Sequence, residues 1–117
     1  MGEIMPYLTV YTNVDFDNSK QLVEDSAKLV SSTLGKPINY VVTNFIYNPN
    51  MSFKGSVDNK GALVDMLSIG FNNKDKLVAD LTSFLSQRLN IADTSNINIS
   101  LNDASASNVA SRGITFG

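Results

Sequence analysis

The sequence of 117 residues contains no cysteine and no histidine. Without cysteine the chain has no disulfide, no thiolate nucleophile and no zinc–thiolate site. Without histidine it has no imidazole base, no Ser-His-Asp triad and no imidazole ligand for a transition metal. Any catalysis must therefore use carboxylates, lysines, tyrosines, backbone groups or an N-terminal amine.

Basic residues are also few, and apolar residues form no long run. Lysine and arginine number 9 against 11 acidic residues, which gives a formal net charge of −2 at pH 7. This balance argues against a nucleic-acid-binding protein, because such proteins need a basic surface for the phosphates. No apolar stretch approaches the roughly 20 residues that span a bilayer, and no signal peptide is visible. We therefore expect a soluble cytoplasmic protein.

What the sequence does contain is a repeated strand–helix–strand pattern. With 43% hydrophobic and 17% charged residues, the chain has the composition of one folded domain. Apolar and β-branched spacing predicts strands at 6–13, 41–47, 62–69 and 97–101, helices at 18–34 and 74–89, and a short β-prone piece at 114–116. Asp17 is the expected N-cap of the first helix, and Asn72 or Asn73 that of the second. Gly35 and Asn90 are the expected left-handed C-caps.

This order predicts an α+β fold, a βαββαβ two-layer sandwich. Two helices would cover one face of a four-stranded mixed sheet. Yet both faces of the first strand are bulky, because Tyr7 and Tyr11 alternate with Leu8 and Val10. Association of subunits is the economical way to cover the second face. The terminal piece at 114–116 would suit addition to the sheet edge of a neighbouring subunit.

Two residues have both an ordinary and a chemical interpretation. Pro6 suits the first position of a strand, where no N–H is needed. If the chain instead began at Pro6 after loss of Met5, its nitrogen would be a secondary amine able to accept a proton. Lys36 is favourably placed at the C-terminus of a helix, which is its ordinary interpretation.

A set of short motifs occurs in one order along the chain. They are Met5-Pro6, Thr12-Asn13-Val14, Gly35-Lys36-Pro37, Met51-Ser52-Phe53 with Gly55-Ser56, Ser68-Ile69-Gly70 and Thr115-Phe116-Gly117. In this order the chain resembles the macrophage migration inhibitory factor family of the tautomerase superfamily. The resemblance covers nearly everything from Met5 onward. It implies one such domain over residues 5–117, with residues 1–4 as an N-terminal extension of uncertain status.

The resemblance implies a homotrimer and a cofactor-independent keto–enol tautomerase of small 2-oxo or enol acids such as phenylpyruvate. By position, Pro6 would be the general base and Lys36 the cation that binds a substrate carboxylate or enolate. The backbone N–H of Ile69 would add a hydrogen bond, and Tyr40 and Phe116 would line the pocket. An N-terminal amine titrates near pH 8, and a nearby cation with an apolar pocket would lower that value. No metal is implied.

The chain departs from the family at several positions. Where animal members usually have tyrosine and asparagine on the fourth strand, this chain has Asn98 and Ser100, which we still expect to contact the substrate. Their tryptophan near the C-terminus corresponds to Ser111. The aromatic wall is thus thinner, so a phenyl ring should bind less well. Arg112 would offer a second cation, and the substrate would be a smaller or more polar acid.

Three hypotheses follow. The first is the tautomerase, which we expect to be inactive while residues 1–5 are retained. The second is a trimeric family member that is catalytically weak or inactive and works as a binding or signalling protein. The third leaves the resemblance aside and is a ferredoxin-like module that binds a small molecule or a subunit. The mature N-terminus separates the first two, and the mass in solution separates both from the third.

Overall fold

The alternating strands and the two amphipathic helices of the sequence form two layers. The computed structural model describes residues 5–117, so the expected extension at residues 1–4 lies outside the described residues. The main elements are β1 (Tyr7–Thr12), α1 (Ser19–Leu34), β2 (Val42–Tyr47), β3 (Ala62–Ser68), α2 (Lys74–Leu89) and β4 (Ile97–Asp103). Short elements connect and extend them: η1 (Ile38–Tyr40), η2 (Thr94–Asn96), η3 (Ala106–Asn108), β5 (Ala110–Ser111) and β6 (Ile114–Thr115).

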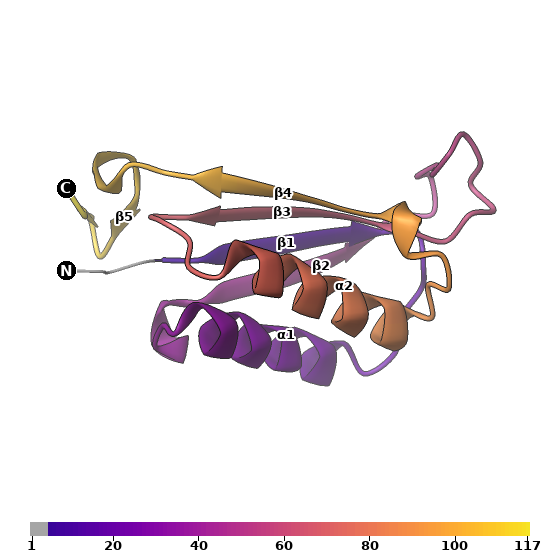
Figure 1. Cartoon of the computed structure of the whole chain (residues 1–117), viewed down its shortest axis with the longest axis horizontal. Coiled ribbons are helices and arrows are strands. Elements are labelled where there is room, and N and C mark those ends of the chain that lie inside the picture. The colour runs from indigo at the N-terminus through magenta and orange to yellow at the C-terminus, as the bar shows by residue number, and fades with distance from the viewer. Residues whose placement is uncertain (1–4) are drawn as a thin grey trace.

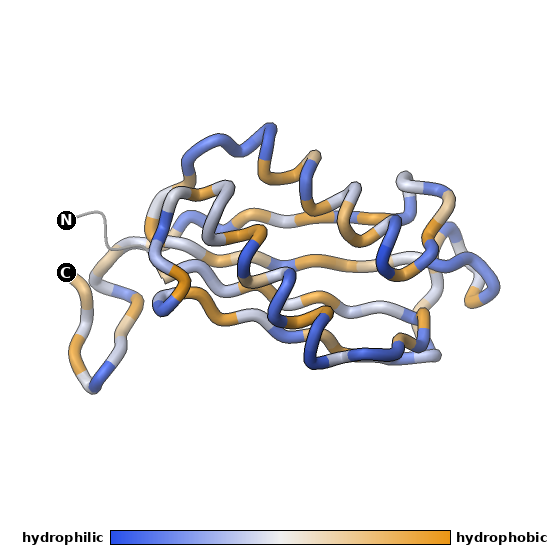
Figure 2. The backbone as a smooth tube through the Cα atoms, turned by 90° about the horizontal axis from the view of Figure 1, so that it is seen from below, coloured by the Kyte–Doolittle hydropathy of each residue, from blue (hydrophilic) through white to orange (hydrophobic). Residues whose placement is uncertain are grey.

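The four long strands form one mixed sheet in the order β2-β1-β3-β4. Strand β1 is parallel to β2 and antiparallel to β3, and β3 is parallel to β4. Both helices lie on the same face of this sheet, side by side (Figures 1 and 2). The predicted α+β sandwich with helices on one face is confirmed.

The core lies between the helices and the sheet. Leucines recur every four residues along α2, at Leu77, Leu81, Leu85 and Leu89, and each is at most 1% exposed. They pack with Leu8 and Val10 of β1 and with Val64 and Met66 of β3 in one hydrophobic cluster. The leucines every four residues on the helix and the apolar residues every two on the strands therefore face the same core.

The ends of the helices correct one expectation. The N-cap of α1 is Asn18 and not Asp17, and it adopts a left-handed conformation without a side-chain capping bond. Asparagine tolerates this conformation better than most residues, which explains the shift by one position. Asn73 caps α2 in the same way, and Gly35 and Asn90 are left-handed C-caps, as predicted.

The strand ends differ from expectation by a few residues. Strand β2 begins one residue later than predicted, β3 ends at Ser68, and β4 continues to Asp103. The extension of β4 follows from its pairing, since Asn102 and Asp103 lie opposite Leu67 and Ser68. Met51 to Phe53 forms no strand, and Phe53 makes only an isolated bridge with Ser56.

The face of the sheet opposite the helices remains open in the single chain. Tyr7, Thr9 and Tyr11 of β1 point to this face and lie between residues of β2 and β3. Its large apolar side chains are well exposed: Val42 at 52%, Ile46 at 40% and Leu63 at 42%. None of the helices within residues 5–117 combines the length and hydropathy that a bilayer crossing needs.

Gly61 is enclosed where the long loop after β2 returns to the sheet. Its carbonyl accepts a hydrogen bond from the Thr12 hydroxyl at 2.7 Å, and its N–H donates to Asn13 at 3.1 Å. A Cβ at this position would lie 2.6 Å from the Asn96 carbonyl oxygen and 2.6 Å from the Phe53 ring. Both contacts are closer than van der Waals distance, so the backbone must move to accept a side chain.

We expect Gly61→Ala to destabilise the fold by about 1–3 kcal/mol, the usual cost of overpacking a closed site. Thermal or urea unfolding of the two proteins measures this difference. An unchanged unfolding midpoint would show that the loop after β2 moves to accept the side chain without a cost in stability.

A second link ties the same loop to η2. The Lys54 ammonium lies 2.8 Å from Asp93 Oδ2, although both side chains are more than half exposed. The hydrogen bond from Lys54, followed by those from Ser95, lowers the pKa of Asp93 from 3.8 to about 2. Because the folded pKa is the lower one, this stabilisation is present above about pH 4 and is lost as the pH falls towards 2.

We therefore expect Asp93→Asn to lower stability at pH 6 while changing it little at pH 2. The effect is modest because the pair is exposed. Urea unfolding of both proteins at the two pH values measures it. Equal losses at pH 6 and pH 2 would assign the effect to something other than the Asp93 charge.

Candidate active site at the start of β1

Pro6 lies directly before β1 and is buried. Its carbonyl accepts a hydrogen bond from the N–H of Val42 at 3.0 Å, which joins the starts of β1 and β2. Proline suits this position because the missing N–H is not needed there. Its nitrogen is an amide in this chain, because Met5 precedes it.

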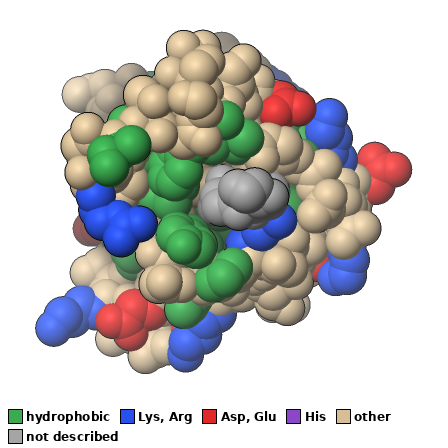
Figure 3. All heavy atoms as spheres, turned by 90° about the vertical axis from the view of Figure 1, so that its left-hand side faces the viewer, with side chains coloured by type: hydrophobic (Ala, Val, Ile, Leu, Met, Phe, Trp, Pro, Cys, Tyr) green, Lys and Arg blue, Asp and Glu red, His purple; other side chains and the backbone are tan. Residues whose placement is uncertain are grey.

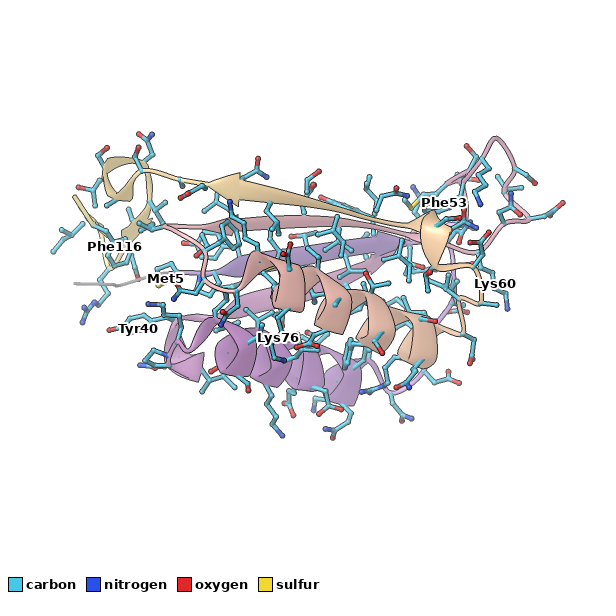
Figure 4. All side chains as sticks on the ribbon, in the orientation of Figure 1. Met5, Tyr40, Phe53, Lys60, Lys76 and Phe116 are labelled. Atoms are coloured by element: carbon cyan, nitrogen blue, oxygen red, sulfur yellow. The ribbon has the colours of Figure 1, made fainter. Side chains whose placement is uncertain are left out.

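A pocket of about 450 Å³ is lined by Met5, the residue before Pro6, together with Asn39, Tyr40, Ser111, Arg112 and Phe116. Met5 is only 8% exposed. Figure 4 shows Met5, Tyr40 and Phe116 at the same end of the molecule, opposite the end that holds Phe53 and Lys60. Two of the predicted site residues, Tyr40 and Phe116, are therefore brought together around Met5 and Pro6.

The end of α1 positions Lys36 and Tyr40 at this same end. Gly35 turns the chain in a left-handed conformation with φ 66°, which most side chains would resist. The N–H of Lys36 then donates to the Ser31 carbonyl at 3.0 Å, and the Lys36 carbonyl accepts from the Ser31 hydroxyl. Pro37 starts the turn of η1, which ends at Tyr40. The backbone of Lys36 is therefore fixed between the end of α1 and the start of η1.

Phe116 is supported by a small hairpin at the C-terminal end. Strands β5 and β6 pair antiparallel, Ala110 with Thr115 and Ser111 with Ile114. The N–H of Phe116 continues this pairing by donating to the Val109 carbonyl at 2.9 Å. The predicted short β piece thus pairs within its own chain, on one of its two edges.

Ile69 follows the last residue of β3. Since Tyr7 lies opposite Leu67, the end of β3 reaches the start of β1, where Pro6 lies. The next N–H, that of Gly70, donates to Asp103 Oδ1 at 2.8 Å and fixes this turn against β4. The Ser68 hydroxyl is fully buried there and has no hydrogen-bond partner among residues 5–117. The sequence analysis names Ser68 only as part of the Ser68-Ile69-Gly70 motif, and its burial could not be predicted from that pattern.

The structure does not bring Asn98 and Ser100 to this pocket. Asn98 lies opposite Leu63, which lies opposite Tyr11, at the far end of β1 from Pro6. Five residues along a strand correspond to roughly 17 Å. Both side chains are exposed on the open face of the sheet. Within one chain they form no site with Pro6.

The pocket end combines apolar and basic groups. Figure 3 shows hydrophobic side chains gathered on this face of the molecule, with basic side chains at their margin. Among residues 5–117, the pocket lining contains Arg112 and no carboxylate. An anionic ligand would therefore meet a positive charge and an apolar wall without a repelling group in the lining.

The sequence matches the model of one protein family, described as macrophage migration inhibitory factor (MIF), over residues 5–117. The chain is also 34% identical to the macrophage migration inhibitory factor of Xenopus tropicalis, covering 96% of this chain and 99% of the relative.

Solved structures agree with this match. The macrophage migration inhibitory factor-like protein of Entamoeba histolytica superposes with a TM-score of 0.86 at 25% identity, covering 96% of this chain and 99% of that chain. The homologue of Prochlorococcus marinus gives a TM-score of 0.85 at 25% identity, covering 95% and 99%. The chain belongs to the macrophage migration inhibitory factor family.

Proposed function

We propose that this protein is a cofactor-independent keto–enol tautomerase of small 2-oxo acids, active when its chain begins at Pro6. The observation that carries the proposal is the position of Pro6. It is buried at the start of β1, beside a pocket of about 450 Å³ whose lining holds aromatic residues and a cation. Membership of the family supports the same activity.

Each direction of the reaction needs two proton transfers, one at carbon and one at oxygen. From the keto acid, the free Pro6 nitrogen removes a proton from the carbon next to the carbonyl, and the enolate oxygen so formed takes a proton from water. From the enol, the protonated Pro6 gives its proton to carbon while the enol oxygen loses its proton to water. Lys36 would balance the negative charge of the carboxylate or enolate, and the N–H of Ile69 would donate to the enolate oxygen.

The proposal includes a homotrimer. The open sheet face carries Val42, Ile46 and Leu63, each at least 40% exposed, so association would remove apolar surface from water. Association would also give Asn98 and Ser100 a place in the site. These residues do not reach the pocket of their own chain, but in a trimer they would contribute to the pocket of a neighbouring subunit.

The direct test is an enol–keto assay on protein that begins at Pro6. Phenylpyruvate and an aliphatic 2-oxo acid would be followed by enol absorbance, with the N-terminus confirmed by intact mass. We expect conversion of at least one of these acids well above the buffer rate. No conversion of either acid by protein with a verified Pro6 terminus would contradict the proposal.

A second function is favoured by one observation on the full chain. Met5 lines the pocket and is only 8% exposed, and it keeps the Pro6 nitrogen an amide. In that form the protein would be a binding or signalling member of the family without chemistry. The assay just described separates the two functions, because a family member without chemistry would stay inactive even when its chain begins at Pro6.

A further inference from the structure

We propose that Arg112 makes this protein selective for 2-oxo acids that carry a second negative charge, such as dicarboxylates. This inference rests on the proposed function, since it concerns the substrate of the same pocket. In it, Arg112 binds the distal carboxylate of the acid, at the end remote from the reacting carbonyl. Arg112 is then a specificity-determining residue that contacts the substrate.

The first observation is the position of Arg112. It lines the pocket that contains Met5, Tyr40 and Phe116, and it also lines a neighbouring hollow of about 460 Å³ formed with Ile114 and Thr115. Arg112 therefore lies at the boundary between the pocket and the open surface. A ligand longer than a simple 2-oxo acid would reach it.

The second observation is that the guanidinium is available. Within residues 5–117, Arg112 takes part in no hydrogen bond or ion pair, and neither hollow is lined by a carboxylate. Arg88, the other arginine, is by contrast held by Asp25 at 2.8 Å and lies over the Phe84 ring. Arg112 is thus the arginine that can accept a carboxylate ligand.

The third observation is the backbone at this residue. Arg112 and Gly113 are the two turn residues of the β5–β6 hairpin, and both have positive φ, at 56° and 78°. A two-residue turn of this kind favours Asn-Gly or Asp-Gly, because both positions need a left-handed conformation. Arginine at the first position stores a small strain, which is more typical of functional sites than of plain turns. Asparagine would make the better turn and arginine the better anion site.

The guanidinium suits this role chemically. It stays charged at every physiological pH and presents paired N–H donors that match a carboxylate. A monocarboxylic 2-oxo acid places its only carboxylate at the reacting end. A dicarboxylic acid has a second one to place at Arg112, so the benefit appears only for the doubly charged substrate.

The test compares two acids of similar shape that differ in charge: phenylpyruvate and its 4-carboxy derivative. Both acids are assayed with protein that begins at Pro6, in the wild type and in the variants Arg112→Asn and Arg112→Lys. We expect the dicarboxylate to be preferred by the wild-type protein. Arg112→Asn should reduce the ratio of kcat/KM values, dicarboxylate over monocarboxylate, by about 5- to 20-fold, mainly through KM. Arg112→Lys should retain part of the preference.

The melting temperature gives an independent readout, because it should not fall when the preference for the dicarboxylate is lost. Because asparagine suits the turn, Arg112→Asn should melt at the same temperature as the wild type or higher, so loss of the preference cannot be assigned to misfolding. Binding of the unreactive acids phenylacetate and 4-carboxyphenylacetate, measured by calorimetry, tests the preference even if the protein proves inactive. Inactivity would overturn the proposed function. Equal binding of the two acids, or an unchanged ratio in Arg112→Asn, would overturn the role of Arg112.

Discussion

Protein that begins at Pro6 should convert the enol of a small 2-oxo acid at least about 100-fold faster than protein that retains residues 1–5. A positioned base contributes roughly 10²–10⁴-fold to a proton transfer. Only the free secondary amine has a lone pair for this task, since an amide nitrogen shares its pair with the carbonyl. Both forms are assayed by enol absorbance after intact-mass verification. Equal rates would show that Pro6 is not the base.

Met5 offers a matched control for this comparison. The Met5 side chain lines the pocket and so obstructs the site. Separately, the Met5 carbonyl makes the Pro6 nitrogen an amide. Met5→Gly in the full chain removes the side chain but keeps Pro6 an amide. We expect this variant to remain inactive, which would assign the effect to the nitrogen. Activity in Met5→Gly would assign it to obstruction.

Pro6→Gly in the short form is a milder change. Glycine leaves a primary amine at the same place, so we expect a reduced but measurable rate. The Val42 N–H would still have a carbonyl to donate to at this position, so the start of the sheet is preserved.

Leu63→Asp should convert the proposed homotrimer into monomers. The wild-type protein is expected to have a mass of roughly three times 12.7 kDa in solution. Leu63 is 42% exposed and lies on the open face of the inner strand β3. An aspartate there would lie on the same strand face as Asp65, and burying this pair of carboxylates against a subunit costs several kcal/mol per ion. Light scattering at micromolar concentration should give a monomer for the variant and a trimer for the wild type.

Val57→Asp is the matched control for the open face. Val57 is 59% exposed, but it belongs to the loop after β2 and not to the sheet. The same charge placed there should leave the mass in solution unchanged. A monomeric wild type, or equal dispersal by both variants, would contradict association through the sheet. Activity lost together with the trimer would support a contribution of Asn98 and Ser100 from a neighbouring subunit.

Much of the fold follows from local patterns. The leucine spacing of α2 and the alternation of β1 both point to one core, so the layers could be predicted without a structure. Asp17 is predicted as the N-cap because aspartate favours that position. The actual N-cap of α1 is Asn18, which is left-handed and makes no side-chain capping bond, so the usual preference does not apply. The end of β4 was missed because Asn102 and Asp103 are held by pairing with β3, which their own sequence does not indicate.

The site was predictable only in part. The family resemblance predicts that Tyr40, Phe116 and Lys36 contact the substrate. In the structure Tyr40 and Phe116 line one pocket, and the role of all three residues stays a prediction. That Met5 lines the pocket could not be predicted, because it depends on how η1 and the C-terminal hairpin pack around the start of β1. Asn98 and Ser100 lie away from the pocket for a geometric reason. Asn98 is level with Tyr11 at the far end of β1, and Ser100 is level with Thr9 in the middle of the sheet.

The most direct measurement of the central claim is the pH dependence of kcat/KM for protein that begins at Pro6. The sequence has no histidine and no cysteine, and the resolved pKa shifts of Asp25, Asp80 and Asp93 are all downward, through hydrogen bonds from Arg88, Lys76 and Lys54 respectively. A base that titrates between pH 5 and 8 would therefore be the N-terminal amine. We expect kcat/KM to rise with pH and to level off with an apparent pKa between about 5 and 8. A flat profile from pH 5 to 9 would contradict Pro6 as the base.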